Sequence, residues 1–353
     1  MIVTMWIEKY RPKRLNEIVG HDAVVRQIQG FVKKNTTPNL VLWGPKGTGK
    51  TSIVYALAKE LYGEFYDENL MHVETADFVD QGKKWLKENK RLKFFYNEQK
   101  SGLVNFKAMI REYSALSPIN TPFKLLFFSN ADLLPRNAQQ ALRRIIEESN
   151  RTCRFIFATT KPAGIIPAIR SRCLNLHFRS LDKSGALDLL TRRIADAEKV
   201  TVTDSGLKTI KDYARGNAVV AITILEAAAV SVSPASSAID EQIVEEVAEN
   251  AFFRRAKAEK LIDLTFAARY TDIRALLEFL IEEERISGKE LLVELHEALR
   301  KRMKTRSNIL TSTFAQLVVY EGEADLKICS SLNTMIPLEE MLVKSIREIS
   351  SSG

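Results

Sequence analysis

The first half of the chain alternates short apolar runs with helical patterns. Residues 39–43 form one such run, which leads into a glycine-rich turn and then into a helical pattern over 52–62. Two further apolar runs, 125–128 and 155–158, are separated by a helical pattern over 136–148. Short buried strands that alternate with helices predict an α/β domain in which helices flank a parallel sheet.

After the last apolar run the strand signals fade. Apolar positions then recur at spacings of three and four, which predicts helices over three segments: 183–198, 203–215 and 219–230. A small polar stretch with one proline, 232–237, indicates a joint or linker. The pattern is helical again from there to a loose tail at 351–353, and we expect breaks at Gly288 and Gly322.

This organisation predicts three domains: an α/β domain over 1–165, a small helical domain over 166–232 and an all-helical domain over 233–353. The composition agrees, because 353 residues with 45% hydrophobic and 27% charged side chains are enough for two or three compact domains at ~100–200 residues each. Disordered and collagen-like classes are excluded.

Membrane and disulfide-rich classes are also disfavoured. No run of about 20 apolar residues is present, and no secretory leader pattern precedes Trp6. The three cysteines, Cys153, Cys173 and Cys329, are few and widely spaced, which argues against a disulfide framework and a paired-cysteine zinc site. We expect a cytoplasmic protein, or a nuclear one if the source is a eukaryote.

The net charge of +8 is compatible with a nucleic-acid partner without requiring one. Residues 83–100 carry seven basic and two acidic side chains, and four aromatic residues stand among them: Trp85, Phe94, Phe95 and Tyr96. Such a segment could stack on bases. Alternatively, its aromatic side chains pack on the core of the α/β domain.

Residues 44–51 carry the chemistry that the sequence predicts most strongly. They fit the pattern G-x-x-x-x-G-K-[ST] and stand between a predicted strand and a predicted helix, as a phosphate-binding loop requires. Backbone amides of this loop would face the β-phosphate of ATP, Lys50 would reach the β- and γ-phosphates, and the Thr51 hydroxyl would ligate Mg²⁺. The expected cofactor-binding residues are Gly44, Pro45, Gly47, Thr48, Gly49, Lys50, Thr51 and Ser52.

Hydrolysis of ATP also requires acidic groups. In such proteins the strand predicted here at 125–128 usually ends in one acid for the Mg²⁺ shell and a second that orients or deprotonates water. Here Ser129 and Asn130 take those places, and neither is a carboxylate. Asp132 follows two residues later, where it either substitutes in part for the missing acid or caps a turn.

Four motifs in sequence order resemble one known family. They are Trp6–Pro12 (WIEKYRP), Gly44–Thr51 (GPKGTGKT), Ala138–Arg144 (AQQALRR) and Arg170–Cys173 (RSRC). They are similar to the N-terminal box, phosphate-binding loop, central helix and Ser-Arg-Cys box of the small subunits of replication factor C. This clamp loader of archaeal and eukaryotic replication belongs to the AAA+ ATPases, and the resemblance extends over nearly the whole chain.

The resemblance implies a pentameric spiral with ATP sites between neighbouring subunits. Its partners would be the large subunit and other small subunits, a ring-shaped sliding clamp, and primer-template DNA. The three domains would be a RecA-like AAA+ ATP-binding domain, a helical lid and a helical collar for oligomerisation.

The resemblance also assigns roles near the nucleotide. Arg172 would be an arginine finger that reaches the γ-phosphate held by the adjacent subunit; the alternative is an ion pair within the chain. Thr160 falls where the family often has an Asn that senses the γ-phosphate. The adenine pocket would be lined by Tyr10, Arg11, Pro12, Ile18 and Val19, unless this N-terminal arm only packs on the core.

The family's second sensor is an Arg, whereas this chain has Val219 at that place. The departures at Ser129, Asn130 and Val219 all concern the chain's own ATP site, while Arg172, which serves a neighbour, is present. This asymmetry predicts a subunit that binds ATP, supplies a finger in trans and hydrolyses its own ATP weakly or not at all.

DNA contacts are expected on two helices. Lys107 and Arg111 are four residues apart and share a face, as do Arg136, Gln140 and Arg144. Rows of this kind can follow a phosphate backbone, and the family resemblance favours Lys107, Arg111 and Arg144 as DNA contacts over a merely solvated face. The clamp would bind the segment 113–119, where Leu116 and Ile119 offer apolar anchors.

Two other functions remain open at this point. One is an autonomous ATPase motor, in which Asp132 or a rearranged water rescues hydrolysis. The other is an AAA+ scaffold that bridges proteins and does not bind DNA.

Overall fold

The fold is described from a computed structural model over residues 4–88, 93–183, 185–232, 238–252, 254–305 and 311–352. Residues 233–237 of the expected joint, Lys90 and Arg91 of the basic segment, and Gly353 lie outside these residues. The chain divides into two compact units, Met1–Val244 and Glu245–Gly353, which are described separately. In the described part of the chain, no helix combines the length and apolar character that a membrane crossing needs.

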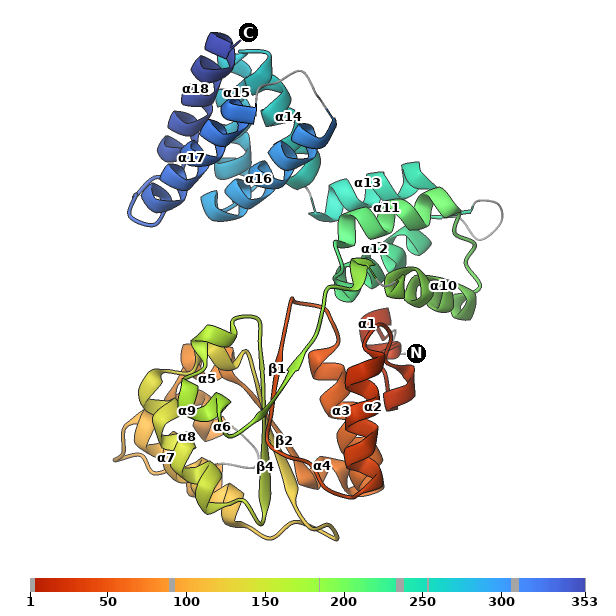
Figure 1. Ribbon diagram of the computed structural model, residues 1–353, viewed down its shortest axis with the longest axis vertical. Helices are drawn as coiled ribbons and strands as arrows, with labels where there is room; N and C mark the ends of the chain where they lie inside the picture. Colours follow the sequence, from red (N-terminus) through yellow and green to blue (C-terminus); the bar gives the residue numbers. More distant parts are fainter. Residues whose placement is uncertain are drawn as a thin grey trace. The chain divides into compact units, whose positions relative to one another are not determined.

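Unit 1 contains a parallel sheet with helices on both faces (Figure 1). The sheet has five strands in the order β2-β3-β4-β1-β5. The strands are β1 Leu40–Trp43, β2 Leu70–Glu74, β3 Lys124–Ser129, β4 Cys153–Thr159 and β5 Leu174–His177. The predicted parallel α/β fold, followed by helices, is therefore confirmed. Since β5 belongs to the sheet, the sheet continues past residue 165, where we expected the α/β domain to end.

The sequence analysis did not predict two of the strands, β2 and β5. β2 carries the polar residues His72 and Glu74 near its end, and β5 is an edge strand in which only Leu176 is fully buried. Neither strand presents the continuous apolar run that marks a central parallel strand. Both pair in full register with their neighbours nonetheless.

Each face of the sheet buries its own hydrophobic cluster. In β3, Leu126 and Phe128 belong to one cluster, and Leu125 and Phe127 belong to the other. This follows from the two-residue period of a strand. The first cluster is covered by α5 Thr75–Gln81, α6 Lys83–Glu88, α7 Gly102–Ala115 and α8 Arg136–Glu148. The second is covered by α2 Asp22–Lys33 and α3 Lys50–Tyr62, with short α4 Tyr66–Asn69 before β2 (Figure 1).

The remaining helices of unit 1 form a small bundle beside the N-terminal segment. These helices are α10 Ala186–Glu198, α11 Asp204–Ala214 and α12 Ala218–Ser231; α9 Pro167–Arg170 precedes β5, and α13 Glu241–Phe252 begins at the unit boundary. Short α1, Trp6–Lys9, packs on α12, where the Trp6 amide donates to Glu226 Oε1 at 3.1 Å. The three predicted helices are confirmed.

Unit 2 is helical throughout its described residues. It consists of α14 Arg254–Phe266, α15 Tyr270–Glu278 with a π-helical turn at Phe279–Glu283, α16 Gly288–Thr305, α17 Thr311–Ile328 and α18 Met335–Ser352. Gly288 begins α16, so the predicted break there is confirmed. The break predicted at Gly322 is wrong: Gly322 lies within α17, where burial of Leu317 and Ala324 outweighs the ~1 kcal/mol helix cost of a glycine.

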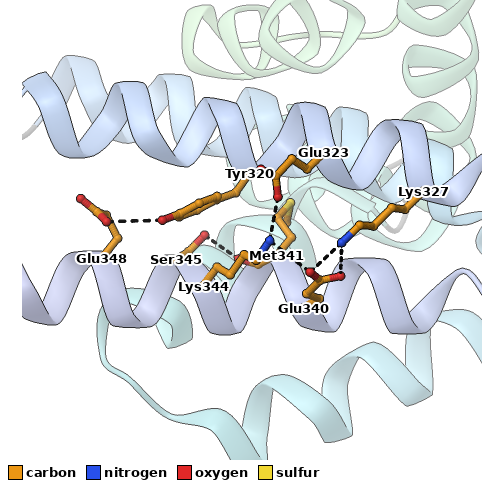
Figure 2. Close-up of polar contacts among 8 residues, drawn as sticks. All are labelled: Tyr320, Glu323, Lys327, Glu340, Met341, Lys344, Ser345 and Glu348. Atoms are coloured by element: carbon orange, nitrogen blue, oxygen red, sulfur yellow. Dashed lines mark hydrogen bonds and ion pairs between the residues drawn. The ribbon is translucent and has the colours of Figure 1, made fainter.

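Ion pairs join α17 to α18 along one side (Figure 2). Lys327 Nζ lies 2.6 Å from Glu340 Oε2, and Lys344 Nζ lies 2.7 Å from Glu323 Oε2. These side chains are partly solvated, and water screens the attraction within each pair. The apolar cluster shared by α14–α18 therefore provides most of the stability of unit 2.

Candidate nucleotide site and basic groove

The phosphate-binding loop leaves β1 and leads directly into α3. Gly47 and Gly49 have φ angles of +67° and +90°, which β-carbon-bearing residues rarely adopt. Gly44 has no room for a side chain, because a Cβ there would lie 2.0 Å from the carbonyl oxygen of Phe178. The glycines of the motif are therefore required by backbone geometry.

Lys50, the first residue of α3, extends back over this loop. Its Nζ donates to the Gly44 carbonyl at 2.8 Å and also contacts the Pro45 carbonyl. No carboxylate pairs with it among the described residues, and burial lowers its pKa to about 8. A desolvated ammonium without an acidic partner fits the anionic phosphates of ATP.

A cavity of about 310 Å³ opens beside the loop. It brings together all five residues expected at the adenine and six of the eight expected in the loop. Its lining includes Tyr10, Arg11, Pro12, Ile18, Val19, Gly47, Thr48, Gly49, Lys50, Thr51 and Ser52. Gly44 and Pro45 do not line it and instead hold Lys50 through their carbonyls. Thr51 belongs to this wall, and its hydroxyl is an oxygen ligand of the kind that Mg²⁺ prefers.

The start of α12 closes one side of the same cavity. Asn217 caps this helix by accepting from the amides of Val219 and Val220, and the Ala218 amide donates to the Gly47 carbonyl at 2.9 Å. Val219 lines the cavity with its apolar side chain. No cation from α12 is therefore available for a phosphate at that position.

The end of β3 is polar, and it contacts an acid that the sequence analysis missed. Glu74, the last residue of β2, accepts from Ser129 Oγ at 2.6 Å and from Asn130 Nδ2 at 2.8 Å. His72 Nε2 lies 2.7 Å from the same Ser129 oxygen. Recognising β2 as a strand would have placed Glu74 here, because carboxyl ends of parallel strands meet at one edge of a sheet.

Asp132 lies in a turn beyond β3 and contacts the end of β4. Its Oδ1 accepts from Thr159 Oγ1 at 2.5 Å, and the turn Ala131–Leu133 packs closely against Gly164. The turn role considered for Asp132 is thus supported. Thr160, the expected sensor, directly follows Thr159 at the end of β4 and is partly exposed.

Arg172 forms an ion pair within the chain. Its Nε lies 2.7 Å from Glu147 Oε1, and its Nη1 donates to the Ala168 carbonyl at 2.8 Å. Arg143 Nε lies 4.0 Å from the same Glu147 oxygen. The side chain of Arg172 remains 31% exposed. In the isolated chain, the alternative of an intramolecular pair is therefore realised.

A basic groove runs between α7 and α8. A hollow of about 1080 Å³ is lined by Lys107, Arg111, Arg136, Gln140, Arg143 and Arg144, with Glu147 at its border. The two rows predicted from sequence thus line one hollow. Arg111 also pairs with Glu148 at 3.1 Å, and both side chains are more than half exposed.

Similarity to known proteins decides the family. Replication factor C small subunit of Methanoculleus marisnigri is 32% identical over 97% of this chain and 96% of its own length. The chain belongs to the replication factor C small subunit family. The relative from Thermofilum pendens is also 32% identical, over 96% of this chain and 95% of its own length.

Two further similarities are more distant. A family model described as DNA polymerase III, delta subunit, matches residues 20–182. A Thermotoga maritima RuvB variant has the same fold, with a TM-score of 0.53 at 18% identity over 81% of this chain and 85% of that one. The expected AAA+ fold and replication factor C membership are both confirmed.

Three aromatic side chains of the basic segment pack inward in this replication factor C chain. Trp85, Phe95 and Tyr96 pack against the cluster that contains Phe106, and Lys87 pairs with Glu98. The side chain of Phe94 lies outside the described part of the structure. The packing role considered for this segment is therefore supported for three of its four aromatic residues.

The loop after α7 presents two apolar side chains to solvent. Leu116 is 50% exposed and Ile119 is 45% exposed. The buried side chain of Asn69 holds this loop, since its Oδ1 accepts from the Ile119 amide and its Nδ2 donates to the Ile119 carbonyl, both at 2.9 Å. The loop is thus fixed while its apolar groups stay accessible.

Proposed function

We propose that this chain is an ATP-binding small subunit of a replication factor C-like sliding-clamp loader. The observation that carries the proposal is the cavity where the phosphate-binding loop, the segment 10–19 and α12 meet. ATP would place its phosphates at Lys50 and its base against Tyr10 and Ile18, with Mg²⁺ at Thr51.

Arg172 acts on the ATP of a neighbouring subunit. Its exposure and its position after α9 leave it accessible from outside the chain, and Glu147 holds it until a neighbour binds. The guanidinium would then stabilise charge on the transferred phosphoryl group. Thr160 takes the sensor position of the chain's own site through its hydroxyl.

The chain's own site hydrolyses ATP slowly. Support comes from Ser129 and Asn130, which provide no carboxylate on β3, and from Val219, which provides no cation on α12. Bound ATP would then serve assembly of the complex. This property separates the proposal from an autonomous ATPase motor.

Primer-template DNA binds in the basic groove. Lys107, Arg111 and Arg144 face the hollow between α7 and α8, a geometry suited to phosphate contacts at any sequence. The sliding clamp binds the exposed loop at Leu116 and Ile119. Further partners are the large subunit and other small subunits, which 233–353 would join as a collar. The lid would be the bundle of α10, α11 and α12, because β5 belongs to the sheet.

The test is ATP turnover with primed DNA and clamp present. The purified chain should be nearly inert, and a mixture with its loader partners should be active. In that mixture Arg172→Ala should slow hydrolysis ~10³-fold without loss of nucleotide binding by the variant chain. Arg26→Ala, which removes an exposed arginine on α2, is the matched control. Normal turnover by the Arg172→Ala assembly would contradict the role in trans.

A further inference from the structure

Glu74 lies where the end of β3 lacks an acid. In the parallel register, Glu74 of β2 is the direct partner of Ser129. Its carboxylate accepts one hydrogen bond from each of the two residues that replace the usual acids. Ser129 donates to Oε2 and Asn130 donates to Oε1. A negative charge is therefore present at this edge of the sheet, but it comes from the neighbouring strand.

The surrounding hydrogen bonds have a defined direction. Ser129 donates its hydroxyl proton to Glu74, so His72 Nε2 must donate to the Ser129 oxygen. His72 Nδ1 is then the acceptor for the Tyr55 hydroxyl, 3.0 Å away. Burial lowers the pKa of His72, in keeping with this neutral form. Glu74 is the charged end of a continuous chain of hydrogen bonds.

This chain of hydrogen bonds ends at Tyr55, next to residues that line the nucleotide cavity. Tyr55 is one helical turn beyond Thr51 on α3 and therefore lies on the same helix face. The guanidinium of Arg11, which lines the cavity, lies 5.7 Å from the centre of the Tyr55 ring. The side chains that connect Glu74 to the cavity are Ser129, His72 and Tyr55.

We propose that Glu74 is the acidic group of this nucleotide site and that it holds the water shell of nucleotide-bound Mg²⁺. The inference rests on the proposed binding of ATP in the cavity. Mg²⁺ keeps several of its waters when bound to nucleotides, so an acid can act on it through water without direct ligation. Glu74 does not line the cavity itself, so its action on Mg²⁺ at Thr51 would pass through water.

The same geometry limits what Glu74 can do. Both carboxylate oxygens of Glu74 already accept a hydrogen bond, Oε2 from Ser129 and Oε1 from Asn130. Glu74 therefore supports metal binding and leaves the attacking water without an efficient base. This combination gives a site that retains ATP and Mg²⁺ but turns ATP over slowly.

The test measures affinity for a fluorescent ATP analogue with Mg²⁺ and with EDTA, using the full chain. For wild type, Mg²⁺ should strengthen binding, and Glu74→Gln should reduce that Mg²⁺-dependent gain ~10-fold or more while affinity in EDTA is unchanged. Glu68→Gln, an identical change at an exposed position of α4, is the matched control. The thermal midpoint of each variant shows that it is folded.

A second variant separates lost charge from a disturbed network. Glu74→Gln combined with Ser129→Asp returns an acid to β3 itself and should recover the Mg²⁺-dependent gain. The inference is overturned if Glu74→Gln keeps the full gain, if wild type shows no gain, or if the folded double variant fails to recover it. Absence of any binding by wild type would instead overturn the proposed function.

Discussion

The Asn217 side chain occupies the space that a side chain on Gly47 would need. A Cβ built on Gly47 would lie 1.6 Å from Asn217 Oδ1. The adjoining Ala218 amide donates to the Gly47 carbonyl at 2.9 Å. The phosphate-binding loop and the start of α12 are therefore fitted to each other at the level of single atoms.

Gly47→Ala should lower both the affinity for ATP and the thermal stability. The new methyl group clashes with Asn217, and the φ of +67° is strained for alanine. Isothermal titration and thermal unfolding measure the two effects.

The companion variant identifies the cause of the Gly47→Ala effect. Asn217→Ala alone loses the cap of α12, at a cost of about 1 kcal/mol. If the clash is the main cause, the double variant should lose less affinity than the sum of the two single variants. Simple additivity would assign the effect to backbone strain at residue 47.

ATP affinity should decrease with pH above about 8. Burial holds the pKa of Lys50 at about 8 in the free chain, and bound phosphates favour the charged ammonium. Binding therefore takes up a proton above that pH, and affinity should fall by up to ~10-fold for each further pH unit. Titrations between pH 7 and 9.5 test this expectation.

The control for the pH dependence is Lys50→Arg. Arginine keeps its charge throughout this range, so its affinity should be nearly independent of pH even if the larger side chain weakens binding. An equally steep pH dependence in Lys50→Arg would show that another group titrates.

The salt dependence of DNA affinity should change when a single basic residue of the groove is replaced. Arg144→Ala should reduce the slope of log affinity against log salt concentration by about 1, because one phosphate contact is lost. Glu148→Gln should strengthen binding, since it releases Arg111 from its ion pair. Fluorescence anisotropy with primed DNA at several salt concentrations gives both values. An unchanged slope in Arg144→Ala, equal to that of the Arg26→Ala control, would exclude Arg144 as a DNA contact.

Asn69→Ala should destabilise unit 1 and release the loop at Leu116. The buried amide of Asn69 serves both backbone groups of Ile119, and its loss leaves them unpaired. The free energy of unfolding should fall by ~2–3 kcal/mol. Urea unfolding measures this, with the exposed Asn16→Ala as control. Clamp affinity should fall as well, while ATP affinity stays unchanged.

The phosphate-binding loop was predictable because its motif and its flanking strand and helix are local in sequence. The contacts of Glu74 with Ser129 and Asn130 were not predictable, because they depend on β2 being a strand. His72 and Glu74 interrupt the apolar pattern that would have identified this strand. The basic rows on α7 and α8 were predicted from helical spacing, but the hollow that they share was not. The pairing of Arg172 with Glu147 joins residues 25 apart and arises only from packing of α8 near α9. Gly322 shows the opposite error. A glycine that was expected to interrupt a helix lies within α17, because buried side chains of that helix stabilise it.

Glu147 borders the basic groove and touches two arginines, Arg143 and Arg172. One carboxylate cannot fully neutralise both, so the two cations compete for it. If an anion bound Arg143, Glu147 would pair with Arg172 alone. If Arg172 moved away, Glu147 would pair with Arg143 alone. A single acid therefore makes the charge of the groove and the freedom of the exposed arginine interdependent.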